Sequence, residues 1–239
     1  MDKSEALKSF RKSLRAAHDP ERARQEKRYL KSPFKFFGVK VPQLRLFAKN
    51  FKRANPGISR EQVFDLASAL WESEYHQEKS LAIMVLEQYP QYLDSEAIPS
   101  IEHMIGGCNG WDHADWISIN LMGRILEKDP VAIRHLVRWS GAWSLWQRRA
   151  SMTAQIRLFR TGGGDRDLFF KIARGMVREK EFFIRKAIGW VVREISKANP
   201  DAARDFLIVI REKASGLTIR EGAKRLPAQM KEEVLGKHQ

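Results

Sequence analysis

The 239-residue sequence predicts an all-α fold. Hydrophobic residues recur at helical spacing along most of the chain, and no stretch alternates hydrophobic and polar residues as a strand does. Residues typical of helix starts also recur at regular intervals. Pro90, Pro130, Asp165 and Pro200 each stand between two amphipathic stretches and lie 40, 35 and 35 residues apart.

This spacing predicts a helical repeat. A period near 35 to 40 residues with two helices in each unit is close to that of HEAT and armadillo repeats. Such units stack on one another into a solenoid with one concave face. We therefore expect one repeat domain over residues 1–239 that forms a right-handed α-α superhelix, with an irregular helical bundle as the alternative.

Capping residues and apolar stripes give the expected helices in order. Residues 1–19 form an amphipathic stretch of mixed charge, and Asp19 with Pro20 starts a helix that runs to about Lys31. Residues 32–43 are expected to form an aromatic, non-helical connector, and Ser59 starts the next helix. Further helices are expected at about 75–88, 94–105, 110–127, 130–140, 144–160, 165–179, 181–197, 200–213 and 217–225.

The composition restricts the class of protein and the cellular compartment that we expect. Hydrophobic residues make up 43% of the sequence, which is enough for a sizeable core, but its purely aliphatic or aromatic runs are short, as in Phe206–Ile210. We expect no membrane span and, because the first residues lack an apolar stretch, no signal peptide. The single cysteine, Cys108, excludes an internal disulfide and an all-cysteine metal site. A reducing, cytoplasmic setting is expected.

The net charge of +14 is concentrated in one half of the chain. Residues 1–120 carry 18 Lys and Arg against 16 Asp and Glu, whereas residues 121–239 carry 25 against 13. A basic half favours a polyanionic partner, above all a nucleic acid. An anionic membrane surface, an acidic protein or a basic surface without a ligand are the alternatives.

One basic residue interrupts an apolar stripe. In "SLWQRRASMTAQIRLFR", Ser144 and Gln147 have capping-box spacing, and Arg149 falls among Leu145, Met152, Ile156 and Phe159 at spacings of 4, 3, 4 and 3. A charge at a core position needs a partner. That partner is either a carboxylate of the protein or a phosphate of a ligand, whose geometry suits a guanidinium.

Helical spacing separates the two aspartates of "NGWDHADWIS". With Asn109 as the expected cap, Asp112 lies in the first turn, where a carboxylate complements the helix dipole. Trp111 and Asp115 share one stripe with Ser118, Met122 and Ile125 and lie one turn apart on it. Asp115 is therefore the better candidate for a functional carboxylate, although an acidic residue without a role fits the pattern equally.

A third stretch, "KEFFIRKAIGWVVREISKANP", places Trp190 beside its core stripe, on the side shared with Lys186 and Arg193. The indole either covers neighbouring hydrophobic surface or presents its face to a base or a cation.

Two other groups of residues are weaker candidates for a functional site. Asp112, His113 and Asp115 point to different helix faces, so no metal site is expected. "TGGGDRD" lacks the lysine of a phosphate-binding loop and is interpreted as a turn between repeats.

These motifs together resemble the AlkD-type DNA alkylation repair glycosylases, a family built from HEAT-like repeats. The resemblance covers most of the chain and is most specific in "KEFFIRKAIGW", followed by "NGWDHADWIS", "SLWQRRAS" and the N-terminal "RYLKSPFKFFGVKVPQLR". It implies excision of cationic N3- and N7-alkylated purines, such as 3-methyladenine and 7-methylguanine, from double-stranded DNA in base excision repair. It also implies a bacterial, nucleoid-associated protein without a cofactor, working as a monomer.

The resemblance assigns roles to single residues. It implies that Asp115 is the catalytic carboxylate, with Trp111, Trp190 and Arg149 on the same concave, DNA-binding surface. Tyr29 matches a tyrosine of the N-terminal motif. We add Arg148, Lys186 and Arg193 as candidate DNA-binding residues because they are basic neighbours of these positions. Gly110 departs from the pattern, since relatives often carry a tryptophan there, and this puts the local wall of the site in doubt.

The chemistry of the expected substrate agrees with a site that combines one carboxylate with aromatic and basic residues. A cationic base leaves without protonation, so one ionised carboxylate that stabilises the oxocarbenium ion and positions a water suffices. Aromatic faces suit a cationic nucleotide, and basic residues suit its phosphates. Because no lysine is implicated as a nucleophile, a monofunctional glycosylase is expected. A non-catalytic DNA-binding repeat protein and a protein-interaction scaffold are the alternatives.

Overall fold

The computed structural model describes residues 1–236, and the chain divides into two compact units, of which the first is Met1–Ile117 and the second begins at Ser118. Each unit has its own helices and core and is described by itself. The expected single domain over 1–239 spans both units and stays a prediction. Its last three residues lie outside the described part of the chain.

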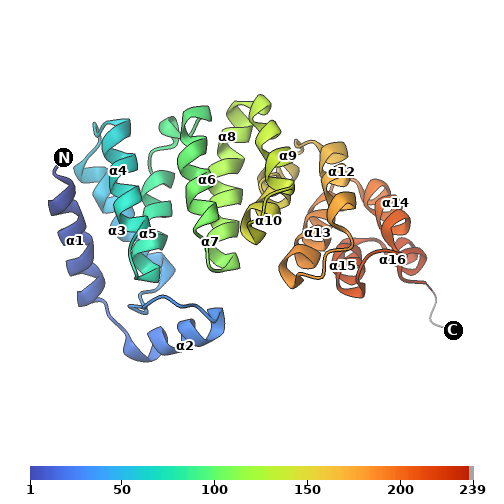
Figure 1. The fold of residues 1–239 in the computed structure, drawn as a ribbon, viewed down its shortest axis with the longest axis horizontal. Helices are drawn as coiled ribbons and strands as arrows, with labels where there is room; N and C mark the ends of the chain where they lie inside the picture. The colour runs from blue at the N-terminus through green and yellow to red at the C-terminus, as the bar shows by residue number, and fades with distance from the viewer. Residues whose placement is uncertain (237–239) are drawn as a thin grey trace. The chain divides into compact units, whose positions relative to one another are not determined.

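The first unit is built from helices that pack side by side, with α4 along α5 and α3 against α5 (Figure 1). Its core contains fully buried side chains such as Leu66, Leu70, Leu81 and Met84. The helices are α1 (Lys3–Ala16), α2 (Pro20–Leu30), α3 (Val41–Ala54), α4 (Arg60–Trp71), α5 (His76–Glu87), α6 (Ile98–Gly106) and α7 (Trp111–Trp116), with short 3₁₀ turns at Pro90–Tyr92 and Ser95–Ala97.

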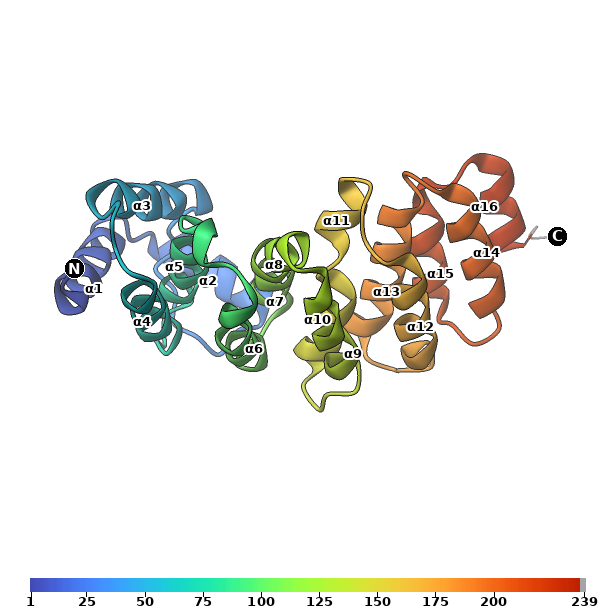
Figure 2. The same cartoon turned by 90° about the horizontal axis from the view of Figure 1, so that it is seen from above.

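The second unit packs around α13, which contacts α10, α11, α12 and α15, while α14 lies beside α16 (Figure 2). A π-helical segment, η3 (Ile117–Met122), leads into the unit from α7. The helices that follow are α8 (Gly123–Lys128), η4 (Pro130–Ile133), α9 (Arg134–Ser140), α10 (Leu145–Thr153), α11 (Ile156–Arg160), α12 (Arg166–Met176), α13 (Phe182–Ile195), α14 (Pro200–Ile210), α15 (Gly216–Gly222), η5 (Ala223–Arg225) and α16 (Ala228–Leu235).

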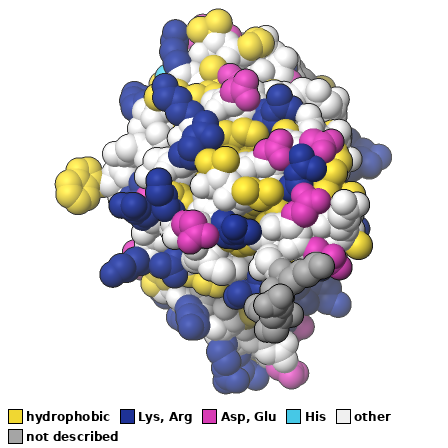
Figure 3. All heavy atoms as spheres, turned by 90° about the vertical axis from the view of Figure 1, so that its right-hand side faces the viewer, with side chains coloured by type: hydrophobic (Ala, Val, Ile, Leu, Met, Phe, Trp, Pro, Cys, Tyr) yellow, Lys and Arg dark blue, Asp and Glu magenta, His cyan; other side chains and the backbone are white. Residues whose placement is uncertain are grey.

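The expected all-α repeat fold is confirmed. Within residues 1–236 the only β-structure is an isolated bridge between Lys35 and Tyr75. None of the helices in this range has the length and apolar character needed to cross a membrane. Lys and Arg side chains are spread over the face of the chain shown in Figure 3, with acidic side chains between them.

Local capping signals correctly predicted several helix starts. Asp19 accepts a hydrogen bond from the Arg22 backbone at 3.0 Å, with Pro20 in the first turn of α2. Ser59 forms a reciprocal capping box with Gln62, and Ser144 caps α10. Each side chain satisfies a backbone N–H that the helix itself leaves without a partner.

Several expected boundaries were wrong. Helix α3 was missed, and it begins at Val41 inside the expected connector, because Pro42 occupies the first turn, where its missing N–H costs nothing. The expected helix 144–160 is interrupted after Thr153 and forms α10 and α11. The expected helix 110–127 contains the π-helical segment, and α16 was not expected.

Gly38 holds the connector against the start of α2. Its φ is +70°, and a Cβ there would overlap the Asp19 carbonyl oxygen and lie 2.7 Å from the Ala23 backbone nitrogen. We expect Gly38→Ala to lower the free energy of unfolding, measured by urea denaturation, by more than about 1 kcal/mol. Gly57→Ala is the control, because its Cβ would meet no atom within 4 Å. Equal stability of the two variants would contradict the prediction.

Candidate functional site

The start of α7 carries the first part of the candidate site. Gly110 is the N-cap and provides no side-chain hydrogen bond, so the prediction that Asn109 caps this helix was wrong. The cap moves by one residue because Trp111 is already helical. Asp112 lies in the first turn, as predicted, and Asp115 lies one turn after Trp111.

Trp111 and Asp115 differ in their exposure. Asp115 is buried, with 7% of its surface exposed. Trp111 is half-buried and meets the ring of Tyr29 edge-on, with the ring centroids 6.4 Å apart. Tyr29, on α2, is 74% exposed. The structure thus brings Tyr29 and Trp111 together on the same part of the first unit that holds Asp115.

An aromatic stack lies behind this turn. The ring of His76, at the start of α5, stacks on Phe36 at 4.5 Å and on His113 at 4.2 Å. The edge of Trp71 meets His113 at 5.6 Å. His76 Nε2 lies 2.6 Å from Asp112 Oδ2, and His113 Nε2 lies 2.9 Å from Ser80 Oγ.

Burial and hydrogen bonding move the pKa values of this cluster in opposite directions. Burial, together with the charge of His76, lowers the pKa of His113 to about 3. Burial alone would raise the pKa of Asp112, but the hydrogen bond with His76 and the nearby imidazoles outweigh it and lower that pKa to about 2. Asp112 is therefore an anion and His113 is neutral at physiological pH.

His76, Asp112 and His113 also resemble a set of metal ligands, because one potential ligand atom of each lies within 4.8 Å of the others. However, the two imidazole planes are nearly parallel, at 21°, and each Nε2 already faces a hydrogen-bonding partner. Ligands of one metal ion must direct their lone pairs to a common point. This geometry describes hydrogen-bonded pairs better than a metal site.

Arg149 and Trp190 form the core of the candidate site in the second unit. Arg149 is buried, as its place in an apolar stripe predicted, and donates a hydrogen bond to the Phe183 carbonyl. Its guanidinium lies 5.9 Å from the Phe183 ring centroid and 5.8 Å from that of Trp190. Trp190 therefore presents its ring to a cation of the protein itself.

A buried glutamate orients this tryptophan. Trp190 Nε1 donates to Glu194 Oε1 at 3.1 Å, and Glu194 also binds Arg160 and Lys197. Burial would raise the pKa of Glu194, but these donors prevail and lower it to about 2. The four-residue spacing of Trp190 and Glu194 on one helix is a signal from which the pair could have been predicted.

A second buried glutamate, Glu221, binds two of the predicted DNA-binding residues, Lys186 and Arg193. Glu221 is 2% exposed and accepts hydrogen bonds from Lys186, Arg193 and Lys224, the last at 2.7 Å. Burial opposes ionisation, but these three cations hold the pKa of Glu221 below its usual range. We call these four residues the Glu221 cluster. It carries three positive charges and one negative charge, and Lys224 had not been predicted.

Arg148 is engaged in contacts within the protein. It forms a two-pronged ion pair with Glu179, with both N–O distances 3.1 Å, and donates to the carbonyls of Ala142 and Trp143. These contacts hold the loop between α9 and α10. The role of Arg148 in DNA binding stays a prediction. In the structure its side chain stabilises the protein through the contacts with Glu179, Ala142 and Trp143.

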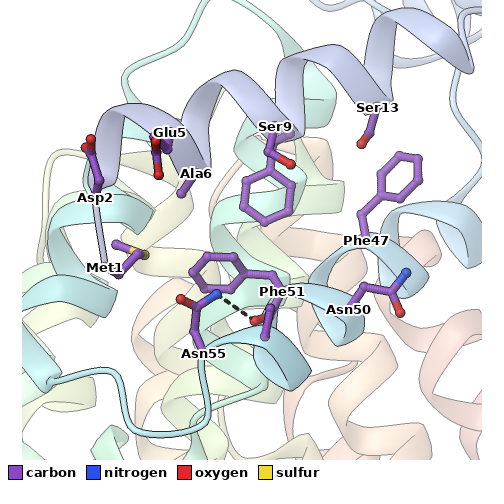
Figure 4. Close-up of a pocket in the computed structure, with 12 residues that line it drawn as sticks. Met1, Asp2, Glu5, Ala6, Ser9, Ser13, Phe47, Asn50, Phe51 and Asn55 are labelled. Carbon is purple, nitrogen blue, oxygen red and sulfur yellow. Dashed lines mark hydrogen bonds between the residues drawn. The ribbon is translucent and has the colours of Figure 1, made fainter.

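Two cavities lie apart from the predicted site residues. One of about 530 Å³ opens between α1 and α3, where Phe47 and Phe51 face Ser9 and Ser13, and Asn55 donates to the Phe51 carbonyl at 3.0 Å (Figure 4). Another, of about 760 Å³, is lined by residues near the glycine turn 162–164. None of the predicted site residues lines either of these two cavities.

The neutral, buried His113 makes stability depend on pH. Its folded pKa is about 3, whereas an unfolded histidine titrates near 6.5, so its contribution is complete above about pH 6.5 and is lost as pH falls towards 3. We expect the free energy of unfolding to fall by about 2 kcal/mol between pH 7 and pH 5.

Urea denaturation at the two pH values tests this. His113→Asn should remove most of the difference, whereas the exposed His103→Asn should keep it. The prediction fails if both variants retain the wild-type dependence.

Comparison with known proteins agrees with this fold and identifies the family. A predicted DNA alkylation repair enzyme from Enterococcus faecalis is 25% identical, with a TM-score of 0.80 over 88% of this chain and 97% of that one. Two further structures share the fold. AlkD2 from Streptococcus mutans is 17% identical, with a TM-score of 0.61 over 79% of this chain and 91% of that one. The protein smu.31 from Streptococcus mutans UA159 is 18% identical, with a TM-score of 0.55 over 91% of this chain and 97% of that one. None of the curated proteins matches. The family model described as DNA alkylation repair enzyme matches residues 10–226, and the chain belongs to this family.

Proposed function

We propose that the protein is a monofunctional DNA glycosylase that excises cationic N3- and N7-alkylated purines, 3-methyladenine and 7-methylguanine among them, from double-stranded DNA. The observation that carries the proposal is the turn of α7 that combines the half-buried Trp111 with the buried Asp115. This turn lies in a chain of the DNA alkylation repair family.

The proposed chemistry needs only one carboxylate. A purine alkylated at N3 or N7 carries a positive charge, so its glycosidic bond breaks without a general acid. Positive charge then develops on the sugar, and Asp115 stabilises it and directs a water to the anomeric carbon. A fixed charge aimed at developing charge is a large catalytic contribution. The aromatic faces of Trp111 and Tyr29 suit a cationic nucleotide.

The second unit supplies the proposed contacts to the DNA backbone. Arg149 and Trp190 form a fixed pair of cation and aromatic ring, and the Glu221 cluster holds Lys186, Arg193 and Lys224 in place. Side chains that bind phosphates fix the position of a duplex without reading its sequence. We propose that the protein works in this way as a monomer, on the nucleoid in the bacterial cytoplasm and without a cofactor.

Base release from methylated duplex DNA tests the catalytic role. We expect Asp115→Asn to lower the single-turnover rate by about 100-fold or more, because the amide cannot balance the oxocarbenium charge. Its affinity for DNA should stay within a few-fold of wild type.

Asp65→Asn, which alters an exposed carboxylate on α4 of the same unit, should leave the rate unchanged. Full activity of Asp115→Asn would reject the mechanism. Salt-sensitive DNA binding by a wild-type protein that releases no base would favour a non-catalytic DNA-binding protein.

Salt dependence tests the binding of phosphates. Each phosphate that the protein no longer neutralises should reduce the slope of log K against log salt concentration by about 0.9. We expect this change in Lys186→Ala, which leaves Arg193 and Lys224 to pair with Glu221. Lys8→Ala, at an exposed position on α1, should keep the wild-type slope. Equal slopes for all three proteins would remove Lys186 from the DNA interface.

A further inference from the structure

The first turn of α7 lacks an ordinary cap. Its N-cap, Gly110, offers no side-chain hydrogen bond, and the α-helical part spans only six residues before the π-helical segment η3. The first N–H groups of a helix have no partner within it, so an uncapped first turn frays easily. Trp111 and Asp115 are carried by this short element and depend on something else to hold it.

The contact between His76 and Asp112 can hold this turn. Asp112 Oδ2 lies 2.6 Å from His76 Nε2, and the two side chains are only 22% and 12% exposed. His76 Nδ1 is buried without a hydrogen-bonding partner. Because an ionised carboxylate can only accept a hydrogen bond, His76 Nε2 carries a proton and donates it to Asp112.

Stacking fixes the direction of this donor. His76 lies between the rings of Phe36 and His113, and His113 is held in turn by Ser80 and Trp71. A ring packed on both faces cannot swing away without breaking the stack. The hydrogen bond to Asp112 therefore has one geometry, which is set by the core of the first unit.

Gly110 leaves the space that this geometry needs. A Cβ at residue 110 would lie 2.7 Å from Asp112 Oδ1. The backbone there is extended, with φ −155° and ψ 160°, a conformation open to any residue. A Cβ at residue 110 therefore conflicts with the present position of the Asp112 carboxylate and not with the backbone conformation. A methyl group there would push this carboxylate from the position in which it meets His76.

We propose that His76, Asp112 and Gly110 form a positioning unit that replaces the missing cap of α7 and sets the directions of Trp111 and Asp115. Its consequence for catalysis rests on the function proposed above. His76 and Asp112 act through the helix they anchor. Loss of the anchor leaves Trp111 and Asp115 present but misdirected, and displacements of about 1 Å can cost 100-fold in rate.

Replacement of the histidine separates positioning from binding. We expect His76→Gln to lower kcat for base release by about 10- to 100-fold with KM changed less than about threefold. His103→Gln is the matched control, because it removes another histidine–carboxylate pair of the same unit, His103 with Glu72 at 2.9 Å. That variant should keep the wild-type kcat. Unchanged kcat in His76→Gln would overturn the proposal.

A double-mutant cycle tests the role of Gly110. Gly110→Ala should lower kcat by about tenfold in the wild-type background, because the new methyl group meets the carboxylate. In the Asp112→Ala background the carboxylate is gone, so the same change should cost less than about twofold. Equal costs in both backgrounds would show that residue 110 acts independently of Asp112 and would overturn the proposal.

A readout without activity distinguishes this inference from the proposed function. The indole N–H signal of Trp111 can be followed in protein with ¹⁵N-labelled tryptophan and assigned with Trp111→Phe. It should shift or broaden in His76→Gln and Gly110→Ala and stay unchanged in His103→Gln. If wild type releases no base, the glycosylase function fails and this signal still decides the positioning role. An unmoved Trp111 signal in His76→Gln overturns the positioning role alone.

Discussion

Buried polar and charged side chains need hydrogen-bonding partners, and in both units several of these partners lie on the next pair of helices. His76 meets Asp112 36 residues away, Arg160 meets Glu194 34 away, and Lys186 meets Glu221 35 away. These separations match the period of the helix pairs. Apolar contacts tolerate small shifts between helices, whereas a buried carboxylate misaligned with its donor is costly. The polar pairs therefore hold each repeat in register with the next.

The candidate functional groups depend on the same pairs. Arg149 keeps its place through the Phe183 carbonyl, and Trp190 is oriented by Glu194. Trp111 belongs to a turn whose carboxylate is held by His76. In each case a hydrogen-bonding partner in the protein holds the side chain, or the turn that carries it, in place. Such preorganisation favours catalysis, because groups that are already aligned need no reorganisation when the substrate binds.

Features that depend on neighbouring residues could be predicted from the sequence. The cap at Ser59 and the common face of Trp111 and Asp115 follow from spacings of three and four residues, which the helix itself enforces. Features that depend on the next repeat could not be predicted. Nothing near His76 indicates that its imidazole meets a carboxylate 36 residues later. The start of α3 could not be predicted either. A proline such as Pro42, which follows the aromatic connector, is compatible both with a longer connector and with the first turn of a helix.

The Glu221 cluster has a consequence for the thermodynamics of ligand binding. Its negative charge weakens the attraction of Lys186, Arg193 and Lys224 for any approaching anion. It also confines three long side chains before an anion arrives, and immobilising each would otherwise cost about 0.5 to 1.5 kcal/mol. That ordering is completed during folding. An anion therefore meets a weaker but already ordered set of donors, and its association carries a smaller entropic penalty than binding to three mobile side chains.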